Sequence, residues 1–198
     1  MSSSPAVHTK VDDMFCALNC TEIPGCMEIV SHVRSDGRGR FVKIFHAPWF
    51  AAQGLRTDFV EQYYSVSRKG VLRGMHFQKP PAEHAKLVYC LDGLVLDAVV
   101  DLRPASATFG KYVVRELSPE SGNMLYVPEG FAHGFLVLSN SATLVYSVTS
   151  VYTPECDSGF HWQSAGIPWP DASPTVSNRD QHLPPLEAVA DSFRGFDR

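Results

Sequence analysis

Residues 70–93 read GVLRGMHFQKPPAEHAKLVYCLDG, and they combine the pattern of two paired β-strands with polar side chains that apolar strands rarely carry. The runs VLRGMHFQ and KLVYCLDG each have the length of a strand, and a Pro-Pro pair separates them. His76 and Lys86 interrupt the apolar pattern. An imidazole that accepts a proton and an ammonium group in one small cavity suit the removal of a proton from a carbon beside a carbonyl.

Short apolar runs continue on both sides of this stretch, with Gly, Pro, Asn and Asp between them. MEIVSHV and RFVKIFH flank the turn SDGRG, and the central part of the chain continues with VEQYYSVS, LVLDAVVDLR, GKYVVREL, GNMLYVP, HGFLVLS and TLVYSVTSVY. Closely spaced strands without helices between them favour an antiparallel sandwich or barrel over a parallel α/β sheet. We therefore predict an all-β, jelly-roll barrel with short peripheral helices.

The ends of the chain have a different character. Residues 1–25 mix Ser, Pro and polar residues with little periodicity, so we expect an N-terminal arm followed by a single domain over residues 26–198. Pro48 to Ala52 form a candidate short helix closed by Gly54, and Leu186 to Phe193 form a second candidate.

Composition limits the classes of partner. The chain has 198 residues, is 44% hydrophobic and carries a formal net charge of −4, without a charge run that would bind nucleic acid or a membrane surface. It contains no apolar stretch of transmembrane length, and its start, MSSSPAVHTK, lacks the apolar core of a signal peptide. We expect a cytoplasmic protein, and the five cysteines are an odd number that favours reduced thiols.

Two segments resemble the paired motifs of the cupin superfamily: His76-Phe77-Gln78 with Gly93 downstream, and GNMLYVPEGFAH, which ends at His133. In cupins these motifs deliver histidines and a carboxylate to one metal ion. Here Gln78 takes the place of the second histidine, and the cationic Lys86 lies near the carboxylate position, where it would repel a divalent ion. We therefore predict a cupin-like site without a metal.

A longer resemblance joins these motifs. The chain resembles the deoxythymidine-diphosphate-4-keto-6-deoxyglucose 3,5-epimerases of rhamnose biosynthesis, and relatives that epimerise one centre, over most of its length, from about Asp36 to Pro185. The segments that carry it are DGRGRF, GVLRGMHFQ, PP with Lys86-Leu87-Val88, VVDLRPASATFGKY, YVPEGFAHGFLVLS, Tyr146 with Tyr152-Thr153-Pro154, Trp169-Pro170 and Ser177-Asn178-Arg179-Asp180.

The resemblance implies a set of catalytic residues. His76 would be the base, and Asp180 would be the carboxylate that pairs with it. Tyr146 would return a proton to the opposite face of the sugar ring, and Lys86 would hold the C4 keto oxygen. The reaction implied is inversion of C3, C5 or both in a nucleotide-diphosphate 4-keto-6-deoxyhexose, in rhamnose-type or O-antigen deoxysugar biosynthesis, without a metal or a redox cofactor.

The resemblance also implies substrate contacts. Arg73 and His133 would line the region of the sugar and diphosphate. Arg38 would belong to an N-terminal strand that is exchanged between subunits and would reach the nucleotide of the partner, which implies a homodimer.

One segment departs from the family. The family pattern before the first motif is Gln-x-Asn-x-Ser, and here the same register reads Glu61-Gln62-Tyr63-Tyr64-Ser65. Glu61 and Tyr63 are therefore candidate substrate-binding residues with altered chemistry. Tyr63 and Tyr64 are neighbours on a strand, so only one of them can face the site. We interpret the segment as a sign of altered regiochemistry or of another nucleotide, such as cytidine diphosphate.

Three other functions fit parts of the pattern. A nucleotide-sugar ketoisomerase also moves protons beside a carbonyl, a metal-dependent cupin oxygenase shares the fold, and a sugar-binding module needs no catalyst. Product analysis, metal analysis and replacement of His76 distinguish these three from an epimerase.

Overall fold

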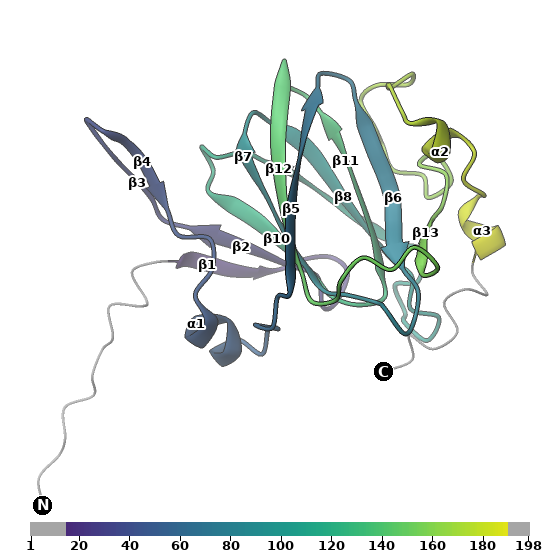
Figure 1. Ribbon diagram of the computed structural model, residues 1–198, viewed down its shortest axis with the longest axis horizontal. Coiled ribbons are helices and arrows are strands. Elements are labelled where there is room, and N and C mark those ends of the chain that lie inside the picture. Colours follow the sequence, from purple (N-terminus) through teal and green to yellow (C-terminus); the bar gives the residue numbers. More distant parts are fainter. Residues whose placement is uncertain (1–14, 190–198) are drawn as a thin grey trace, which may run out of the picture.

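The computed structural model describes residues 15–189, which form two antiparallel sheets that face each other (Figure 1). The six-stranded sheet has the order β1 (Phe15–Cys20), β2 (Met27–Ser31), β10 (Asn123–Val127), β7 (Lys86–Asp92), β12 (Ser141–Val148) and β5 (Glu61–Arg68). The five-stranded sheet has the order β13 (Asp157–Gly159), β6 (Leu72–Gln78), β11 (Phe131–Val137), β8 (Val95–Asp101) and β9 (Tyr112–Leu117). This architecture confirms the prediction of an all-β jelly roll.

The remaining elements lie outside the two sheets. A separate hairpin, β3 (Val33–Asp36) with β4 (Gly39–Val42), projects away from the body (Figure 1). Three short helices complete the described chain: α1 (Ala47–Ala52), α2 (Asn178–Gln181) and α3 (Leu186–Val189).

Alternation along the strands sends apolar side chains both into the space between the sheets and onto the outer faces of the sheets. On β10, Leu125 and Val127 point into the space between the sheets, whereas Met124 and Tyr126 pack on the outside near α1. Side chains on successive strand residues point to opposite faces, so a strand that is buried on both sides reads as a continuous apolar run. The outer face of the five-stranded sheet is covered by the C-terminal segment, from which Phe160 packs against it.

The backbones of β6 and β11 approach each other closely beside Gly74 and Gly134. A Cβ atom on Gly74 would lie 2.6 Å from the Cα of Gly134, and one on Gly134 would lie 2.8 Å from the backbone oxygen of Arg73. Gly74 also has a φ of +140°, which disfavours other residues. The approach fixes how β6 presents its polar side chains next to β11.

Most predicted elements exist, with corrections at their ends. Within the predicted arm over residues 1–25, Phe15–Cys20 form β1 and pair with β2; residues 1–14 lie outside the described part. The predicted strand RFVKIFH ends at Val42. The helix expected from Leu186 is described as far as Val189, and the rest of that prediction lies outside the described residues.

The helix predicted at Pro48 is α1, whose first turn is capped by His46: its Nδ1 accepts a hydrogen bond from the backbone N–H of Trp49 at 3.3 Å. Within residues 15–189, no helix is long and apolar enough to cross a membrane.

Candidate active site

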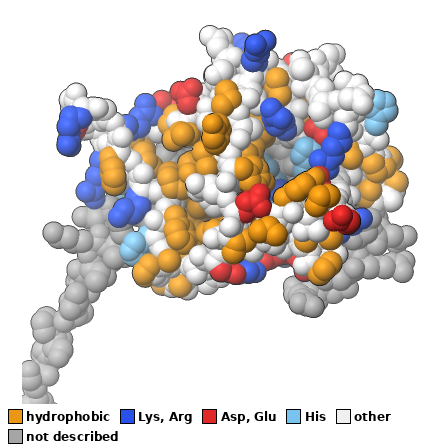
Figure 2. Space-filling view, viewed as in Figure 1, with side chains coloured by type: hydrophobic (Ala, Val, Ile, Leu, Met, Phe, Trp, Pro, Cys, Tyr) orange, Lys and Arg blue, Asp and Glu red, His pale blue; other side chains and the backbone are white. Residues whose placement is uncertain are grey.

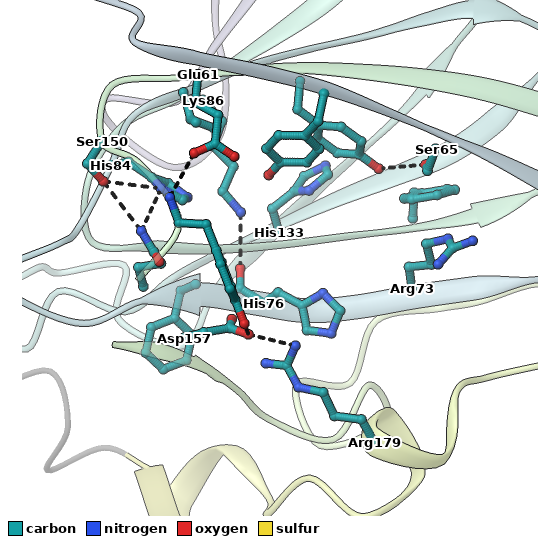
Figure 3. Close-up of a pocket in the computed structure, with 17 residues that line it drawn as sticks. Glu61, Ser65, Arg73, His76, His84, Lys86, His133, Ser150, Asp157 and Arg179 are labelled. Carbon is teal, nitrogen blue, oxygen red and sulfur yellow. Dashed lines mark hydrogen bonds and ion pairs between the residues drawn. The ribbon is translucent and has the colours of Figure 1, made fainter. Parts of the chain in front are cut away.

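A cavity of about 400 Å³ opens between the two sheets, and polar side chains from both walls point into it (Figure 3). The six-stranded sheet contributes Glu61, Tyr63, Ser65, Lys86, Tyr146 and Val148, and the five-stranded sheet contributes Arg73, His76, Phe77, Gln78, His133, Phe135 and Asp157. His84, Ser150, Tyr152 and Arg179 complete the lining.

His76 and Asp180 form a hydrogen-bonded pair. The Nε2 atom of His76 lies 2.7 Å from Oδ1 of Asp180, which is buried at the start of α2. Burial opposes the charge of Asp180, but the hydrogen bond and the charge of His76, together with donors at Gly74 and Ser177, lower its pKa. An ionised carboxylate accepts the Nε2 proton of His76, so the neutral ring keeps its lone pair on Nδ1.

A second pair stands on the neighbouring strand. His133 lies opposite His76 in the register of β11 and β6, and its Nε2 atom is 2.8 Å and 2.9 Å from the two carboxylate oxygens of Asp97. Asp97 is fully buried on β8, and burial raises its pKa while His133 opposes that rise. The sequence pattern did not identify Asp97, although a carboxylate in the middle of the apolar run LVLDAVV is a signal that a partner is needed.

Lys86 brings its ammonium group into the same space from the first position of β7. Its side chain is buried, and Nζ donates to the backbone oxygen of His76 at 3.5 Å, so it spans the gap between the sheets (Figure 3). Burial lowers the pKa of Lys86 to about 8, and the more distant Asp157 and Asp97 oppose the shift. An ammonium group with a single long contact keeps donors available for a bound oxygen atom.

Tyr146 lies on β12, on the wall opposite His76. Its hydroxyl shares a hydrogen bond of 3.3 Å with the hydroxyl of Ser65, and its ring stacks on Tyr63 with centroids 4.9 Å apart. Burial raises the pKa of Tyr146, so the hydroxyl keeps its proton at physiological pH. Tyr146 therefore offers a proton from the six-stranded sheet, whereas His76 offers a lone pair from the five-stranded sheet.

The mouth of the cavity carries charged residues of both signs. Arg73 donates from Nε to the hydroxyl of Ser67 at 3.0 Å, and Glu61 accepts the backbone N–H of Tyr152 at 2.8 Å. Arg179 forms an ion pair of 2.8 Å with Asp157. Arg73 and Arg179 therefore place two positive charges at the cavity, with the carboxylates of Glu61 and Asp157 among the same lining residues.

A polar cluster closes the end of the cavity around Gln78. Its Nε2 donates to the backbone oxygen of Ala82 at 2.8 Å, and its Oε1 accepts the N–H of Thr153 at 2.7 Å. His84 lies beside it, with Nδ1 at 3.2 Å from the Gln78 amide nitrogen. Burial, followed by the charges of Lys86 and His133, lowers the pKa of His84 to about 3, so its ring stays neutral. Gln78 thus serves as a structural amide that joins three segments.

The structure brings together all but one of the predicted site residues. His76, Lys86, Tyr146, Arg73, His133, Glu61 and Tyr63 line the cavity, and Asp180 stands behind His76. Arg38 does not reach the cavity of its own chain: it lies in the turn of the projecting hairpin, where its side chain is 91% exposed and pairs with Asp36. The roles of these residues stay predictions.

Some lining residues were missed because they come from segments that carry no strand pattern. Arg179 directly precedes Asp180, His84 lies two residues before Lys86, and Asp157 belongs to the three-residue strand β13. The sequence of a loop does not show whether a charged side chain points into a cavity or into solvent, because most charged side chains in loops are solvated.

Comparison with known proteins gives a consistent result. The family model described as dTDP-4-dehydrorhamnose 3,5-epimerase matches residues 20–188, which include every residue that lines the cavity. The dTDP-4-dehydrorhamnose 3,5-epimerase of Shigella flexneri is 43% identical over 163 residues, which are 81% of this chain and 90% of the relative. A dTDP-4-dehydrorhamnose 3-epimerase of Streptomyces niveus is 40% identical over 162 residues, which are 80% of this chain and 78% of the relative.

Solved structures agree. The crystal structure of a dTDP-6-deoxy-D-glucose-3,5-epimerase from Legionella pneumophila, in complex with dTDP-4-keto-L-rhamnose, matches with a TM-score of 0.85 at 35% sequence identity. The match covers 89% of this chain and 96% of that chain, so the two chains share their fold over most of their length.

Proposed function

Because the chain belongs to the dTDP-4-dehydrorhamnose 3,5-epimerase family, which confirms the resemblance seen in its sequence, we propose that it inverts carbon centres beside the C4 ketone of a dTDP-4-keto-6-deoxyhexose. The choice of dTDP as the nucleotide rests on the three relatives described above, whose names each carry it. The single observation that carries the mechanism is that His76 and Tyr146 face each other from opposite walls of one cavity.

The first step is removal of a proton from C3 or C5 by His76. The Nε2 atom donates to Asp180, so the Nδ1 lone pair takes the proton. The electron pair of the broken C–H bond forms the carbon–carbon double bond of an enolate, and the C4 oxygen becomes negative. Asp180 stabilises the imidazolium that results, because it stays ionised beside the ring.

Lys86 stabilises the enolate oxygen. Its side chain is buried, and a charge interaction in a buried site is much stronger than in water. A preorganised donor of this kind favours the transition state over the neutral ketone, because the negative charge appears only as the proton leaves.

Tyr146 completes the inversion. It returns its hydroxyl proton to the carbon from the wall opposite His76, so the new C–H bond forms on the other face of the ring. The phenolate regains a proton from solvent, and His76 loses the one that it took. Protons and electron pairs balance over the cycle, without an oxidant or a reductant.

The remaining polar residues bind the substrate. Arg73 and Arg179 supply positive charge for the diphosphate, and His133, Glu61 and Tyr63 line the space left for the sugar. The neutral His84 and Gln78 close the far end.

We also propose that two copies of the chain form the working enzyme. The hairpin β3–β4 extends from the body with Phe41 at 62% exposure and Arg38 at its tip (Figure 1). Hydrophobic side chains gather on the face over β5, where Tyr64 and Val66 are exposed, and basic side chains mark the hairpin (Figure 2). A second copy on this face would cover the apolar residues and place Arg38 at the partner's cavity.

Incubation with the keto-sugar in deuterium oxide tests the reaction. We expect deuterium at C3, C5 or both, together with inversion of the labelled centre. His76→Asn should lower the rate of incorporation by about 100-fold or more, the usual loss for a general base. Wild-type protein that incorporates no deuterium at either carbon contradicts the proposal, and a C3 ketone in the product identifies a ketoisomerase instead.

A further inference from the structure

Tyr63 stands directly opposite Tyr146 on the neighbouring strand. In the register of β5 and β12 the two residues are partners, and their rings stack with centroids 4.9 Å apart and planes inclined by 21°. Directly opposed side chains on paired strands lie on the same face, so both rings belong to the cavity wall. Tyr63 is itself 41% exposed, whereas Tyr146 is buried.

Tyr146 is held on three sides. Tyr63 covers one face of its ring, His133 meets it edge-on at 5.9 Å, and the hydroxyl is bonded to Ser65. Ser65 and Tyr63 are two residues apart on β5 and point to the same face, so one strand fixes both the ring and its hydroxyl. The proton that Tyr146 donates therefore leaves from a nearly fixed point.

An acid in a fixed position limits which carbon atoms of the sugar it can protonate. The carbons C3 and C5 lie on either side of the C4 ketone, and both become acidic through the same oxygen. An acid that inverts both centres must reach two different positions above the sugar ring, either by its own movement or by movement of the sugar. An acid clamped between Tyr63 and His133 delivers its proton well to one of them.

We propose that Tyr63 is a positioning residue that holds Tyr146 for reprotonation of one carbon, so that the enzyme inverts one of the two centres far faster than the other. This inference rests on the proposed epimerase function. The ring that covers the acid belongs to Tyr63 itself, on the strand paired with that of Tyr146.

Replacement of Tyr63 by Ala tests the clamp. Wild-type protein should invert and label one carbon, and Tyr63→Ala should raise the share of inversion at the second carbon by about three- to tenfold, the range that corresponds to loss of one aromatic pair. Nuclear magnetic resonance of the product in deuterium oxide reports both the label and the configuration at each carbon.

Two matched variants separate the stack from other effects. Tyr63→Phe keeps the ring and removes the hydroxyl, so its ratio of inversion at the two carbons should equal that of the wild type. Phe109→Ala removes another exposed aromatic ring, which is 37% exposed, does not line the cavity and lies outside the face assigned to the second copy, and it should leave the ratio unchanged as well.

Three results would overturn the inference: comparable inversion of both centres by the wild type, an unchanged ratio in Tyr63→Ala, or a change in Tyr63→Phe as large as that in Tyr63→Ala. Failure of the proposed function gives a different result, because the wild type would then label neither carbon.

Discussion

Lys86 carries a positive charge in a position where the fold alone favours an apolar side chain. It is buried at the start of a strand whose next members, Leu87 and Val88, belong to two different apolar clusters, one on each face of the sheet. Burial lowers its pKa from the usual 10.5 to about 8, which means that the folded protein holds this charge at a cost. The charge that is proposed to serve the reaction therefore lowers the stability of the folded protein.

Lys86→Met should therefore make the protein more stable and inactive. Met has a similar length and no charge, so the variant should gain up to about 3 kcal/mol in the free energy of unfolding at pH 7, where the charged form is the costly one. Loss of the oxyanion donor should lower kcat by about 100-fold or more. Denaturant unfolding and the deuterium assay measure the two effects.

The pH dependence of the stability difference is the control for this prediction. Between about pH 8 and pH 10.5 the unfolded chain holds the Lys86 proton and the folded protein does not, so wild-type stability rises with pH across this window. The advantage of Lys86→Met should shrink there. An advantage that stays constant from pH 7 to pH 10.5 would show that the charge of Lys86 is not its source.

Residue-level prediction from sequence worked where a polar group interrupts an apolar strand. His76 and Lys86 stand out in this way, and family resemblance added Asp180, which no strand pattern identifies. Asp97 was missed because one carboxylate among 21 acidic residues has no visible partner until the fold places β8 beside β11. Pairing between distant strands is tertiary information that local patterns do not carry.

At the level of elements, the close contact of β6 and β11 determines the geometry of the cavity. Arg73, His76 and His133 all belong to these two strands, and Gly74 and Gly134 allow their backbones to approach. A side chain at either glycine would force the strands apart. The positions of the two histidine rings depend on this contact.

Gly134→Ala should destabilise the protein and disturb the site. The new Cβ would lie 2.7 Å from Sδ of Met75 and 2.8 Å from the backbone oxygen of Arg73, and the backbone atom cannot move away cheaply. Overpacking of this kind costs about 1–3 kcal/mol, which lowers the melting temperature by several degrees in a chain of this size. Thermal unfolding measures the change.

Gly37→Ala is the matched control, because a Cβ at Gly37 meets no atom within 4 Å. Its melting temperature should stay within about one degree of the wild-type value. If Gly134→Ala were equally neutral, the close contact of β6 and β11 would not be a constraint on the fold.

Elements were predicted well where both faces of a strand are buried, as in GNMLYVP and HGFLVLS. The first strand, FCALNC, was assigned to the arm because polar residues and a cysteine pair obscure its alternation. The strand β13 has only three residues, and all three pair with β6. Short strands of this kind are specified by their partners rather than by their own sequence.

For the whole molecule, the position of Arg38 raises the question of how many chains make one site. Its guanidinium pairs with Asp36 at the tip of the hairpin, far along the chain from the cavity residues and outside the cavity lining. A cation that serves a diphosphate at its own cavity would have to lie at the mouth, as Arg73 and Arg179 do. The proposed dimer gives Arg38 a function that a single chain does not.

Hybrid dimers test this proposal directly. Arg38→Ala lacks the cation that would reach the partner, and His76→Asn lacks the base, so each homodimer should be nearly inactive at low substrate concentration. If the two variants are mixed, unfolded and refolded together, about half of the dimers should be hybrids. Each hybrid has one site in which His76 of one chain meets Arg38 of the other, so about a quarter of wild-type activity should return. If Arg38 acted within its own chain, the mixture would stay inactive, and a monomer in sedimentation analysis would exclude the dimer itself.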